Sequence, residues 1–367
     1  MTWYMYQNYG TALQAVALNK AISNLGYRAF DIAYDPELNN SRRKRKLIPR
    51  LVNRVKGFTP LVSAKRSLAF NIFLETHLPR TSPINTDSDF RDLNGRFDAF
   101  VSGSDQIWSP RCFDARYFLD FVDSPKKKIS YGPSFGCDVV TDPSIVRDMS
   151  RLISDYSSLS VREKSGIDIV ESLTGRRPVS VVDPTLLLNS SQWANMMMPH
   201  AEPSSSYCLF YFLGSDACNE LAARKIAADR DLNICVVPIF ERQKRSRESV
   251  GTNVGPGEFL ALIQGASLVL TDSFHGMVFA ALLNREFVAF ERFDPRSLDS
   301  QNTRIYSFLD MIDSREALLS RRELETDTAF TPKDLDFDRI NKQIEQRRQE
   351  SLDYLRGALS RATDGGI

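Results

Sequence analysis

Short apolar runs separated by stretches of helix length are the feature that most constrains the fold of this chain. From residue 97 onward these runs alternate with loops and helical segments. Strands joined by helices lie parallel in sheets whose two faces are covered, so each strand is apolar throughout. The sequence therefore predicts an α/β protein with parallel sheets. The predicted strands are Phe97–Val101, Lys128–Tyr131, Ser157–Val161, Val179–Val182, Tyr207–Phe212, Ile234–Pro238, Ser267–Leu270 and Glu286–Phe290.

The length of 367 residues is enough for two domains that each bury a core. The apolar fraction of 42% and the charged fraction of 25% are those of ordinary globular proteins, which argues against a disordered chain. We expect an N-terminal Rossmann-like domain over 1–188 and a C-terminal one over 189–335. The remaining segment, 336–367, carries most of a polar helix, Leu335–Ser360, which could pack back on the N-terminal domain.

The beginning of the sequence predicts a helix without a full strand in front of it. Apolar residues recur on one face of Thr11–Leu25, and Gly26 ends this helix. Tyr27–Ala33 is then a predicted strand. A βαβ unit also needs a strand ahead of its helix, and only Met1–Tyr6 is available for it. Either this strand is short or residues ahead of Met1 complete it.

A basic stretch covers residues 41–66, and apolar residues such as Leu47, Ile48 and Leu51 interleave with its basic side chains. We favour a solvated helical insertion in the N-terminal domain. The alternative is a segment that docks on an anionic membrane surface or a lipid-linked substrate. The basic residues are Arg42, Arg43, Lys44, Arg45, Lys46, Arg50, Arg54, Lys56, Lys65 and Arg66.

Charge and cysteine usage limit the partners and the compartment. The chain has 47 basic and 46 acidic residues, so no global field favours nucleic acid. Its five cysteines are scattered without a CxxC pair, which indicates reduced thiols. Met1–Gly10 does not read as a secretory signal, and no apolar run is long enough to span a membrane. We therefore expect a cytoplasmic protein, at the inner face of the membrane if the basic stretch docks there.

Small and polar residues follow several predicted strands, at the edge where open parallel sheets bind ligands. The first candidate is the segment with Asn8, Tyr9 and Gly10, which opens the first predicted helix. Glycine allows close backbone approach, and a helix start offers N–H groups to an anion. The alternative is a plain turn and helix cap.

The loop after Phe97–Val101 is the second candidate. Gly103, Ser104 and Asp105 could form the floor of a binding site. Trp108 could pack on a sugar ring, and its alternative is packing in the core.

Two further candidates follow the next strands. Ser134 lies among small residues just past Lys128–Tyr131. Arg162 ends an apolar strand and presents a fork of donors suited to a carboxylate or phosphate, and Glu163 could hold it in place. The alternative for this pair is a salt bridge at the start of a helix.

The segment Gly265–Gly276 gives the strongest indication of chemistry. Its buried strand delivers Asp272, Ser273 and His275 to one turn at the positive end of the next helix. A histidine there can carry a proton near neutral pH, with a hydroxyl or carboxylate to orient it. The alternative is a buried structural histidine.

Other catalytic motifs do not occur. The chain has no phosphate loop, no dinucleotide GxGxxG and no HExxH zinc helix, which excludes those enzyme classes. His77 and His200 lie among prolines and loop residues and favour structural roles. Asp183 precedes Pro184 and is expected to be extended, as a hinge between the domains.

Five motifs follow one another along the chain: Asn8–Gln14 (NYGTALQ), Phe97–Trp108 (FDAFVSGSDQIW), Ser160–Glu163 (SVRE), Val182–Leu187 (VDPTLL) and Thr271–Gly276 (TDSFHG). In order and spacing, up to about residue 310, the sequence resembles the polysaccharide pyruvyl transferase family. Each motif is modest alone, and the set of five is specific.

The resemblance implies a glycosyltransferase-B-like arrangement of two Rossmann-like domains with the active site in the cleft between them. Such enzymes move pyruvate from phosphoenolpyruvate onto two hydroxyls of a sugar as a cyclic ketal and release phosphate. They act in capsule, exopolysaccharide or cell-wall polymer synthesis. The expected acceptor is a lipid-linked or nucleotide-linked oligosaccharide, and we expect no cofactor and no metal.

The resemblance also implies roles for individual residues. His275 is expected to act as acid or base, with Asp272 and Arg162 as the other catalytic residues. Arg162 is expected to neutralise the carboxylate or phosphate of the donor. The residues expected to bind substrate are Asn8, Tyr9, Gly10, Gly103, Ser104, Asp105, Trp108, Ser134, Glu163, Ser273, Gly276 and Arg304.

One family feature is missing. Members often carry an arginine just before the active-site histidine, where this chain has Ser273 and Phe274. Arg304 is the expected replacement, with Arg292 and Arg285 as weaker candidates.

Two other functions stay open from the sequence. One is glycosyl transfer from a nucleotide sugar on the same fold, and the other is a non-catalytic module that binds a sugar or nucleotide. The presence of both His275 and Arg162 argues against the module, and the set of motifs argues against glycosyl transfer.

Overall fold

The computed structural model describes residues 1–5, 7–36, 60–200, 206–297, 300–326 and 333–363. The chain divides into two compact units: unit 1 consists of Met1–Ser41, Glu75–Leu188 and Ile344–Ile367, and unit 2 of Arg42–Leu74 and Asn189–Gln343. Of the basic stretch 41–66, only 60–66 lie within the described residues. These belong to unit 2, not to the N-terminal domain in which we expected them.

Unit 1 contains two small parallel sheets. Strand β1 (Phe100–Ser102) pairs with β2 (Lys128–Ser130), and β3 (Ser160–Val161) pairs with β4 (Val179–Ser180). An isolated parallel bridge between Ile129 and Ser158 links the two sheets, and backbone hydrogen bonds join the same two segments. All four strands lie within or next to the predicted apolar runs, and they are shorter than predicted.

The predicted strand Tyr27–Ala33 is wrong as a regular strand. Within the described residues, the segment and the residue after it form isolated parallel bridges, Asp31 with Arg80 and Tyr34 with Ile84, and no regular strand. Both bridges lie on one side of the segment, because both partners come from residues 80–84. Regular strand pairing therefore does not extend along it.

Capping residues mark the ends of several helices in unit 1. Helix α1 (Tyr9–Asn24) has Asn8 as its N-cap. Helix α6 (Pro143–Ser154) starts with proline behind the N-cap Asp142, and α7 (Lys164–Thr174) ends at Gly175, which has φ +68°. The other helices that lie in unit 1 or enter it are α4 (Ala64–His77), α5 (Asp87–Asp92) and α14 (Phe337–Thr363).

The core of unit 1 is rich in aromatic rings. Trp108 is fully buried and stacks on Phe118, with ring centroids 5.2 Å apart. The rings of Phe135 and Tyr156 meet it edge-on. Of the two alternatives for Trp108, the structure therefore supports packing in the core.

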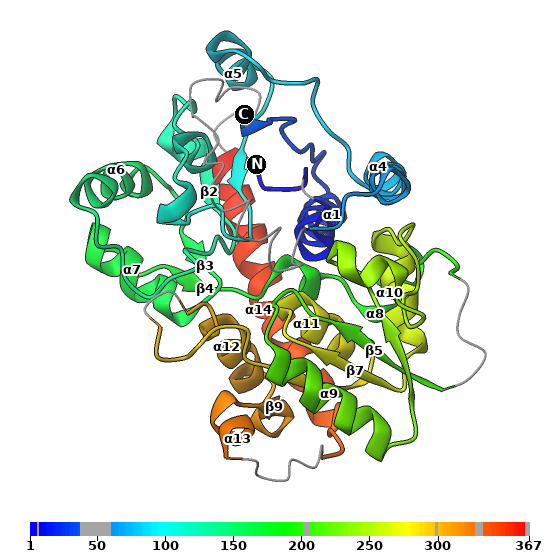
Figure 1. Ribbon diagram of the computed structural model, residues 1–367. Coiled ribbons are helices and arrows are strands. Elements are labelled where there is room, and N and C mark those ends of the chain that lie inside the picture. Colours follow the sequence, from blue (N-terminus) through cyan, green and yellow to red (C-terminus); the bar gives the residue numbers. More distant parts are fainter. Residues whose placement is uncertain (6, 37–59, 201–205, 298–299, 327–332, 364–367) are drawn as a thin grey trace. The chain divides into compact units, whose positions relative to one another are not determined.

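Unit 2 is built on a five-stranded parallel sheet with the order β6-β5-β7-β8-β9. Figure 1 labels β5, β7 and β9 of this sheet. The predicted α/β fold with parallel sheets is confirmed. The short edge strand β9 was not predicted from the sequence. The strands are β5 (Tyr207–Tyr211), β6 (Asn233–Val236), β7 (Leu268–Thr271), β8 (Glu286–Phe290) and β9 (Leu318–Leu319).

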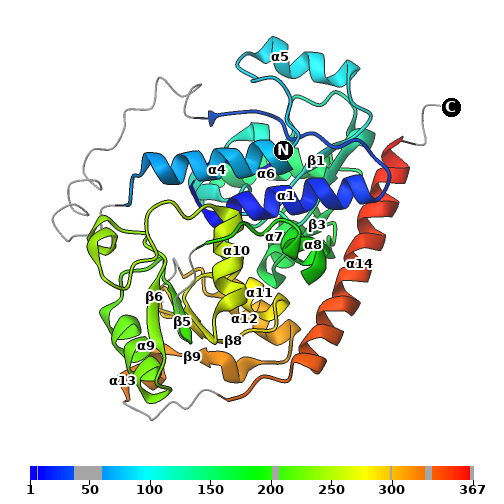
Figure 2. The same cartoon turned by 90° about the vertical axis from the view of Figure 1, so that its right-hand side faces the viewer.

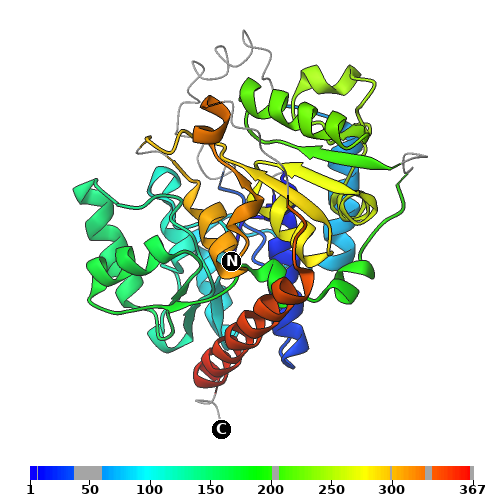
Figure 3. The same cartoon turned by 90° about the horizontal axis from the view of Figure 1, so that it is seen from below.

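Helices cover both faces of this sheet, which explains why its central strands are apolar throughout (Figure 3). Leu268 and Leu270 of β7 share a buried cluster with Ile226 of α9 (Ala217–Asp229). The alternate residues of β7 point to the opposite face, on the side of α11 (Phe274–Leu282). The other helices of unit 2 are α8 (Ser190–Ala194), α10 (Pro256–Gly265), α12 (Thr303–Met311) and α13 (Arg321–Glu325).

Single 3-10 turns connect many of these elements. They are η1 (Leu93–Gly95), η2 (Pro110–Cys112), η3 (Ala115–Phe118), η4 (Pro125–Lys127), η5 (Pro184–Leu187), η6 (Glu241–Arg245) and η7 (Arg315–Ala317).

Candidate active site

The turn between β7 and α11 of unit 2 places His275 in the first turn of a helix. Ser273 is the N-cap of α11, and its hydroxyl oxygen accepts a hydrogen bond from the backbone N–H of Gly276 at 3.3 Å. The Thr271 hydroxyl donates to the Tyr211 carbonyl at 2.5 Å and accepts from the Ser273 N–H at 3.0 Å. These bonds fix the backbone on both sides of the turn that carries His275.

The His275 side chain is almost buried, with 7% of its surface exposed. Its ring meets the Phe274 ring at 78°, with centroids 5.0 Å apart. It lies in the first turn of α11, at the positive end of the helix dipole, which favours an anion.

Gly276 has a packing role in this turn. A Cβ at this position would lie 2.6 Å from the Thr271 hydroxyl oxygen and 3.0 Å from a ring carbon of Tyr211. Any side chain would therefore push the start of α11 away from the sheet. The structure places Gly276 in the turn for close approach of helix and strand.

The Asp272 carboxylate connects the ends of two neighbouring strands. Its two oxygens accept the backbone N–H groups of Leu213 at 2.6 Å and Gly214 at 2.7 Å, in the loop after β5. Burial raises the pKa of Asp272, although Arg292 and these amide donors oppose the shift. Both oxygens thus hold the β5 loop, and this geometry supports a positioning role for Asp272.

Arg292 is the arginine attached to this turn. It follows β8, and its guanidinium donates to the Asp272 backbone carbonyl at 2.9 Å and lies 3.7 Å from the Asp272 carboxylate. Arg304 instead bonds Gln301 at 3.1 Å near the start of α12, and Arg285 bonds the Leu283 carbonyl at 3.1 Å. Among the three candidates for the missing arginine, these contacts favour Arg292.

In unit 1, Arg162 lies between carboxylates. Its Nε donates to Glu163 at 2.7 Å, and Nη1 donates to Asp183. Asp183 also accepts the N–H and the hydroxyl of Thr185, at 3.0 and 2.7 Å. Burial alone would lower the pKa of Arg162, but the carboxylates of Glu163, Asp183 and Asp105 outweigh it, so the pKa is raised.

This cluster, Arg162 with Glu163 and Asp183, is buried, and its one cation already pairs with two carboxylates. The geometry supports the salt bridge that the sequence left open for Arg162 and Glu163. Asp183 was predicted only as an extended hinge residue. Thr185, two residues later, was a sequence signal for a turn at Asp183, because Asp and Thr in this spacing form a local hydrogen-bonded turn.

Asp105 forms a second polar contact in unit 1, just past the end of β1. Its backbone is left-handed, with φ +66°, and its carboxylate accepts the Thr11 hydroxyl at 2.7 Å. The Ser134 N–H donates to the Asp105 carbonyl at 2.8 Å. A strained backbone that neighbours hold in place is common at functional sites. Thr11, whose N–H donates to the Asn8 side chain at 3.2 Å, was not singled out from the sequence.

The other predicted binding residues of unit 1 are buried. Tyr9 and Gly10 lie in the first turn of α1. The Ser104 hydroxyl donates to the Gly132 carbonyl at 2.9 Å, and a Cβ on Gly103 would lie 2.9 Å from Cβ of Thr2. For Gly103 and Ser104 these contacts indicate packing between neighbouring segments.

Within the residues that the structure describes, no group of three or more His, Cys, Asp or Glu side chains could hold a metal ion. The same described part of the chain contains no helix that is long and apolar enough to cross a membrane.

Comparisons with known proteins relate this chain to one family. A search of solved structures gives the E. coli ADP-heptose LPS heptosyltransferase II, which covers 94% of this chain and 97% of its own length with 12% identity and a TM-score of 0.35, a weak similarity. No curated protein matches the sequence. The family model described as polysaccharide pyruvyl transferase matches residues 8–295, which include the turn of His275 and the cluster of Arg162. The chain therefore belongs to the polysaccharide pyruvyl transferase family and is a transferase.

Proposed function

We propose that this protein transfers pyruvate from phosphoenolpyruvate onto two hydroxyls of a sugar as a cyclic ketal. In this reaction C3 of the donor gains a proton and its C2–O bond to phosphate breaks. Two sugar oxygens bond to C2 and lose their protons, so the products are the ketal and inorganic phosphate. The observation that carries the proposal is the fixed, nearly buried His275 at the start of α11 in a chain of this family.

His275 is the proposed proton carrier. Imidazole transfers protons near neutral pH, which suits a step that protonates an enol carbon and deprotonates hydroxyls. The hydrogen bonds of Thr271 and Ser273 hold the backbone of this turn, so the His275 ring is attached to a fixed backbone at the edge of the sheet. The N–H groups at the start of α11 would attract an anionic group of the donor.

Arg292 is the proposed anion contact beside His275. It lies against the Asp272 backbone and keeps 18% of its side chain exposed, so it is held in place and accessible. Guanidinium groups bind carboxylates and phosphates through paired hydrogen bonds. Arg304, the residue expected from the sequence, stays an alternative.

We further propose a lipid-linked or nucleotide-linked sugar acceptor and contact with the inner face of a membrane in a polysaccharide-producing cell. Helix α4, which begins within the basic stretch and continues past it, supports this contact. Helix α4 exposes Leu68 and Ile72, which are 60% and 44% accessible, and Lys65 lies on the same helix. Apolar and basic residues on one helix are typical of segments that lie on anionic membranes.

The direct test incubates the purified protein with phosphoenolpyruvate and candidate acceptors. We expect release of phosphate together with an acid-labile ketal on the acceptor. Nucleotide sugars are the control donors. Consumption of a nucleotide sugar while phosphoenolpyruvate stays intact would replace the proposed reaction with glycosyl transfer.

A further inference from the structure

Arg292, the proposed anion contact, is held by three neighbours in unit 2. Its Nη2 donates to the Asp272 backbone carbonyl at 2.9 Å, and its guanidinium carbon lies 5.7 Å from the centroid of the Phe293 ring. A Cβ on Gly214 would lie 3.0 Å from Cγ of Arg292, so the arginine stem packs closely on that glycine. Within the described residues its buried Nε makes no hydrogen bond, and 18% of the side chain is exposed. The guanidinium is therefore placed without being fully paired.

The side chain of Asn302 fixes the backbone of the residue directly after Arg292. Its amide donates to the Phe293 carbonyl at 2.7 Å, and its side-chain carbonyl accepts the Phe293 N–H at 3.2 Å. Asn302 is 1% exposed and is the N-cap of α12. Asparagine at an N-cap usually bonds the N–H groups of its own helix, and in the described structure Asn302 makes no such bond. Its side chain instead joins the start of α12 to Phe293.

Glu291 fixes the residue on the other side of Arg292, in a region where β8, α11 and α12 lie side by side (Figure 2). Its carboxylate accepts the Tyr306 hydroxyl of α12 and, at 2.8 Å, the backbone N–H of Arg321 at the start of α13. Its backbone carbonyl accepts the Asn219 side chain of α9 at 3.0 Å. Glu291 is 7% exposed, so these contacts are buried. The backbone is thus held on both sides of Arg292.

This arrangement matters for binding because arginine has many rotamers. A guanidinium that is ordered only when an anion arrives loses conformational entropy at that moment, which weakens binding. A guanidinium that is already in place loses less. The alternative for Asn302 is a purely structural clamp that joins β8 to α12.

We propose that Asn302 is a positioning residue for donor binding, which acts through Phe293 on the guanidinium of Arg292. The proposal rests on the proposed function, in which Arg292 binds the carboxylate or phosphate of the donor, and extends it to a residue that does not itself contact the donor. Arg304 follows Asn302 by two residues, so the test includes this second arginine.

The test measures the Kd of phosphoenolpyruvate by calorimetry in a double-mutant cycle of Asn302→Ala and Arg292→Gln. We expect Asn302→Ala alone to weaken binding about three- to tenfold, because the guanidinium must then be ordered on binding. Added to Arg292→Gln, the same change should alter the Kd by less than about twofold, since residues that act through one another are not additive. Phe293→Leu removes the ring and should give the same pattern, which decides the question if Asn302→Ala does not fold.

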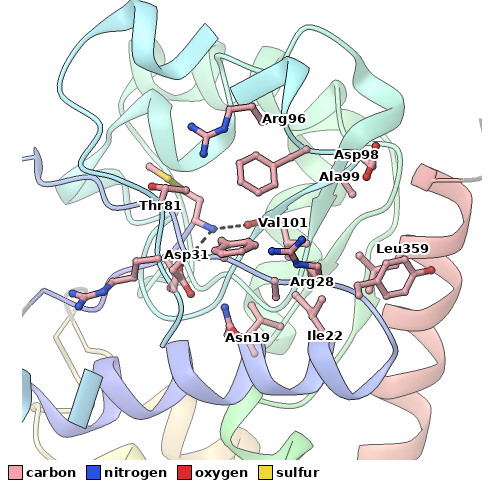
Figure 4. Close-up of a pocket in the computed structure, with 18 of the residues that line it drawn as sticks. Asn19, Ile22, Arg28, Asp31, Thr81, Arg96, Asp98, Ala99, Val101 and Leu359 are labelled. Carbon is pink, nitrogen blue, oxygen red and sulfur yellow. Dashed lines mark hydrogen bonds and ion pairs between the residues drawn. The ribbon is translucent and has the colours of Figure 1, made fainter. Parts of the chain in front are cut away.

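Two control variants should leave the Kd unchanged. Asn189→Ala removes another buried-face asparagine contact of unit 2, the side-chain bond that accepts the Gln192 N–H at 2.9 Å at the start of α8. Arg28→Gln tests unit 1, where a cavity of about 720 Å³ is lined by Arg28 and Arg96 among other residues (Figure 4). Loss of binding in Arg28→Gln would place the measured anion in unit 1 and overturn the proposal.

Equal weakening by Asn302→Ala with and without Arg292→Gln, or no weakening at all, would show a structural clamp and overturn the proposal. Coupling of Asn302→Ala to Arg304→Gln in place of Arg292→Gln would overturn it as well. Turnover is measured separately. Coupling in the Kd without ketal formation would reject the reaction and keep the positioning role, whereas ketal formation without coupling would reject only the positioning role.

Discussion

The turn of His275 in unit 2 and the cluster of Arg162 in unit 1 both follow parallel strands, yet they hold their polar side chains differently. The turn is held by hydroxyls and backbone amides around Thr271, Asp272 and Ser273. The cluster is held by opposite charges, with Arg162 between two carboxylates. The hydrogen bonds of Thr271, Asp272 and Ser273 fix the backbone of the turn, whereas the guanidinium of Arg162 is itself engaged by two buried carboxylates and contributes to the fold.

The first prediction tests whether His275 takes part in catalysis, as its place in the turn suggests. His275→Gln should lower phosphate release from phosphoenolpyruvate by about 10³-fold, since general acid–base catalysis contributes that order of magnitude. The thermal midpoint should stay within about 2 °C, because a similar polar side chain fills the space. His200→Gln is the matched control in the same unit and should keep its activity. Activity above a tenth of the original would remove His275 from the mechanism.

The second prediction concerns the charges around Arg162. Arg162→Met should lower the free energy of unfolding by about 3–5 kcal/mol, because it leaves two buried carboxylates without their cation. Denaturant unfolding measures the loss. Adding Asp183→Asn should recover part of it, since one of the two charges is then gone. Weaker donor binding at unchanged stability would instead favour the donor contact expected from the sequence.

The third prediction tests Asp272 as a positioning residue. Asp272→Asn should cost about 2 kcal/mol of stability, because an amide accepts from only one of the N–H groups of Leu213 and Gly214. The pKa of Asp272 is raised above 3.8 in the folded state, so stability should fall as pH rises from 3.8 through the folded pKa. The variant should lack this part of the pH profile. An identical profile in both proteins would contradict the assignment.

The smallest effect is expected at Thr11. Thr11→Val removes the hydroxyl that donates to Asp105 and should lower the free energy of unfolding by about 1–2 kcal/mol. Thr11→Ser keeps the hydroxyl and should retain most of the stability. If valine stabilises the protein, the contact contributes nothing.

Several parts of the fold followed from the sequence because they depend on local pattern. Apolar runs placed β5, β7 and β8, and a helix start after Thr271 was expected from the turn of Ser273 and His275. Strand β9 has only two residues, too few for any pattern. The segment Tyr27–Ala33 has the composition of a strand, but regular pairing also needs neighbours that sequence composition does not supply.

The sequence by itself determined the α/β class, the position of His275 at the start of a helix, and the family. These depend on periodicity, capping and motif order, which are properties of neighbouring residues. Only the tertiary structure decided that Asp272 holds the loop after β5, that Trp108 is core, and that Arg162 is balanced by Asp183. Such partners are far apart in sequence, and which groups meet depends on how the strands and loops pack.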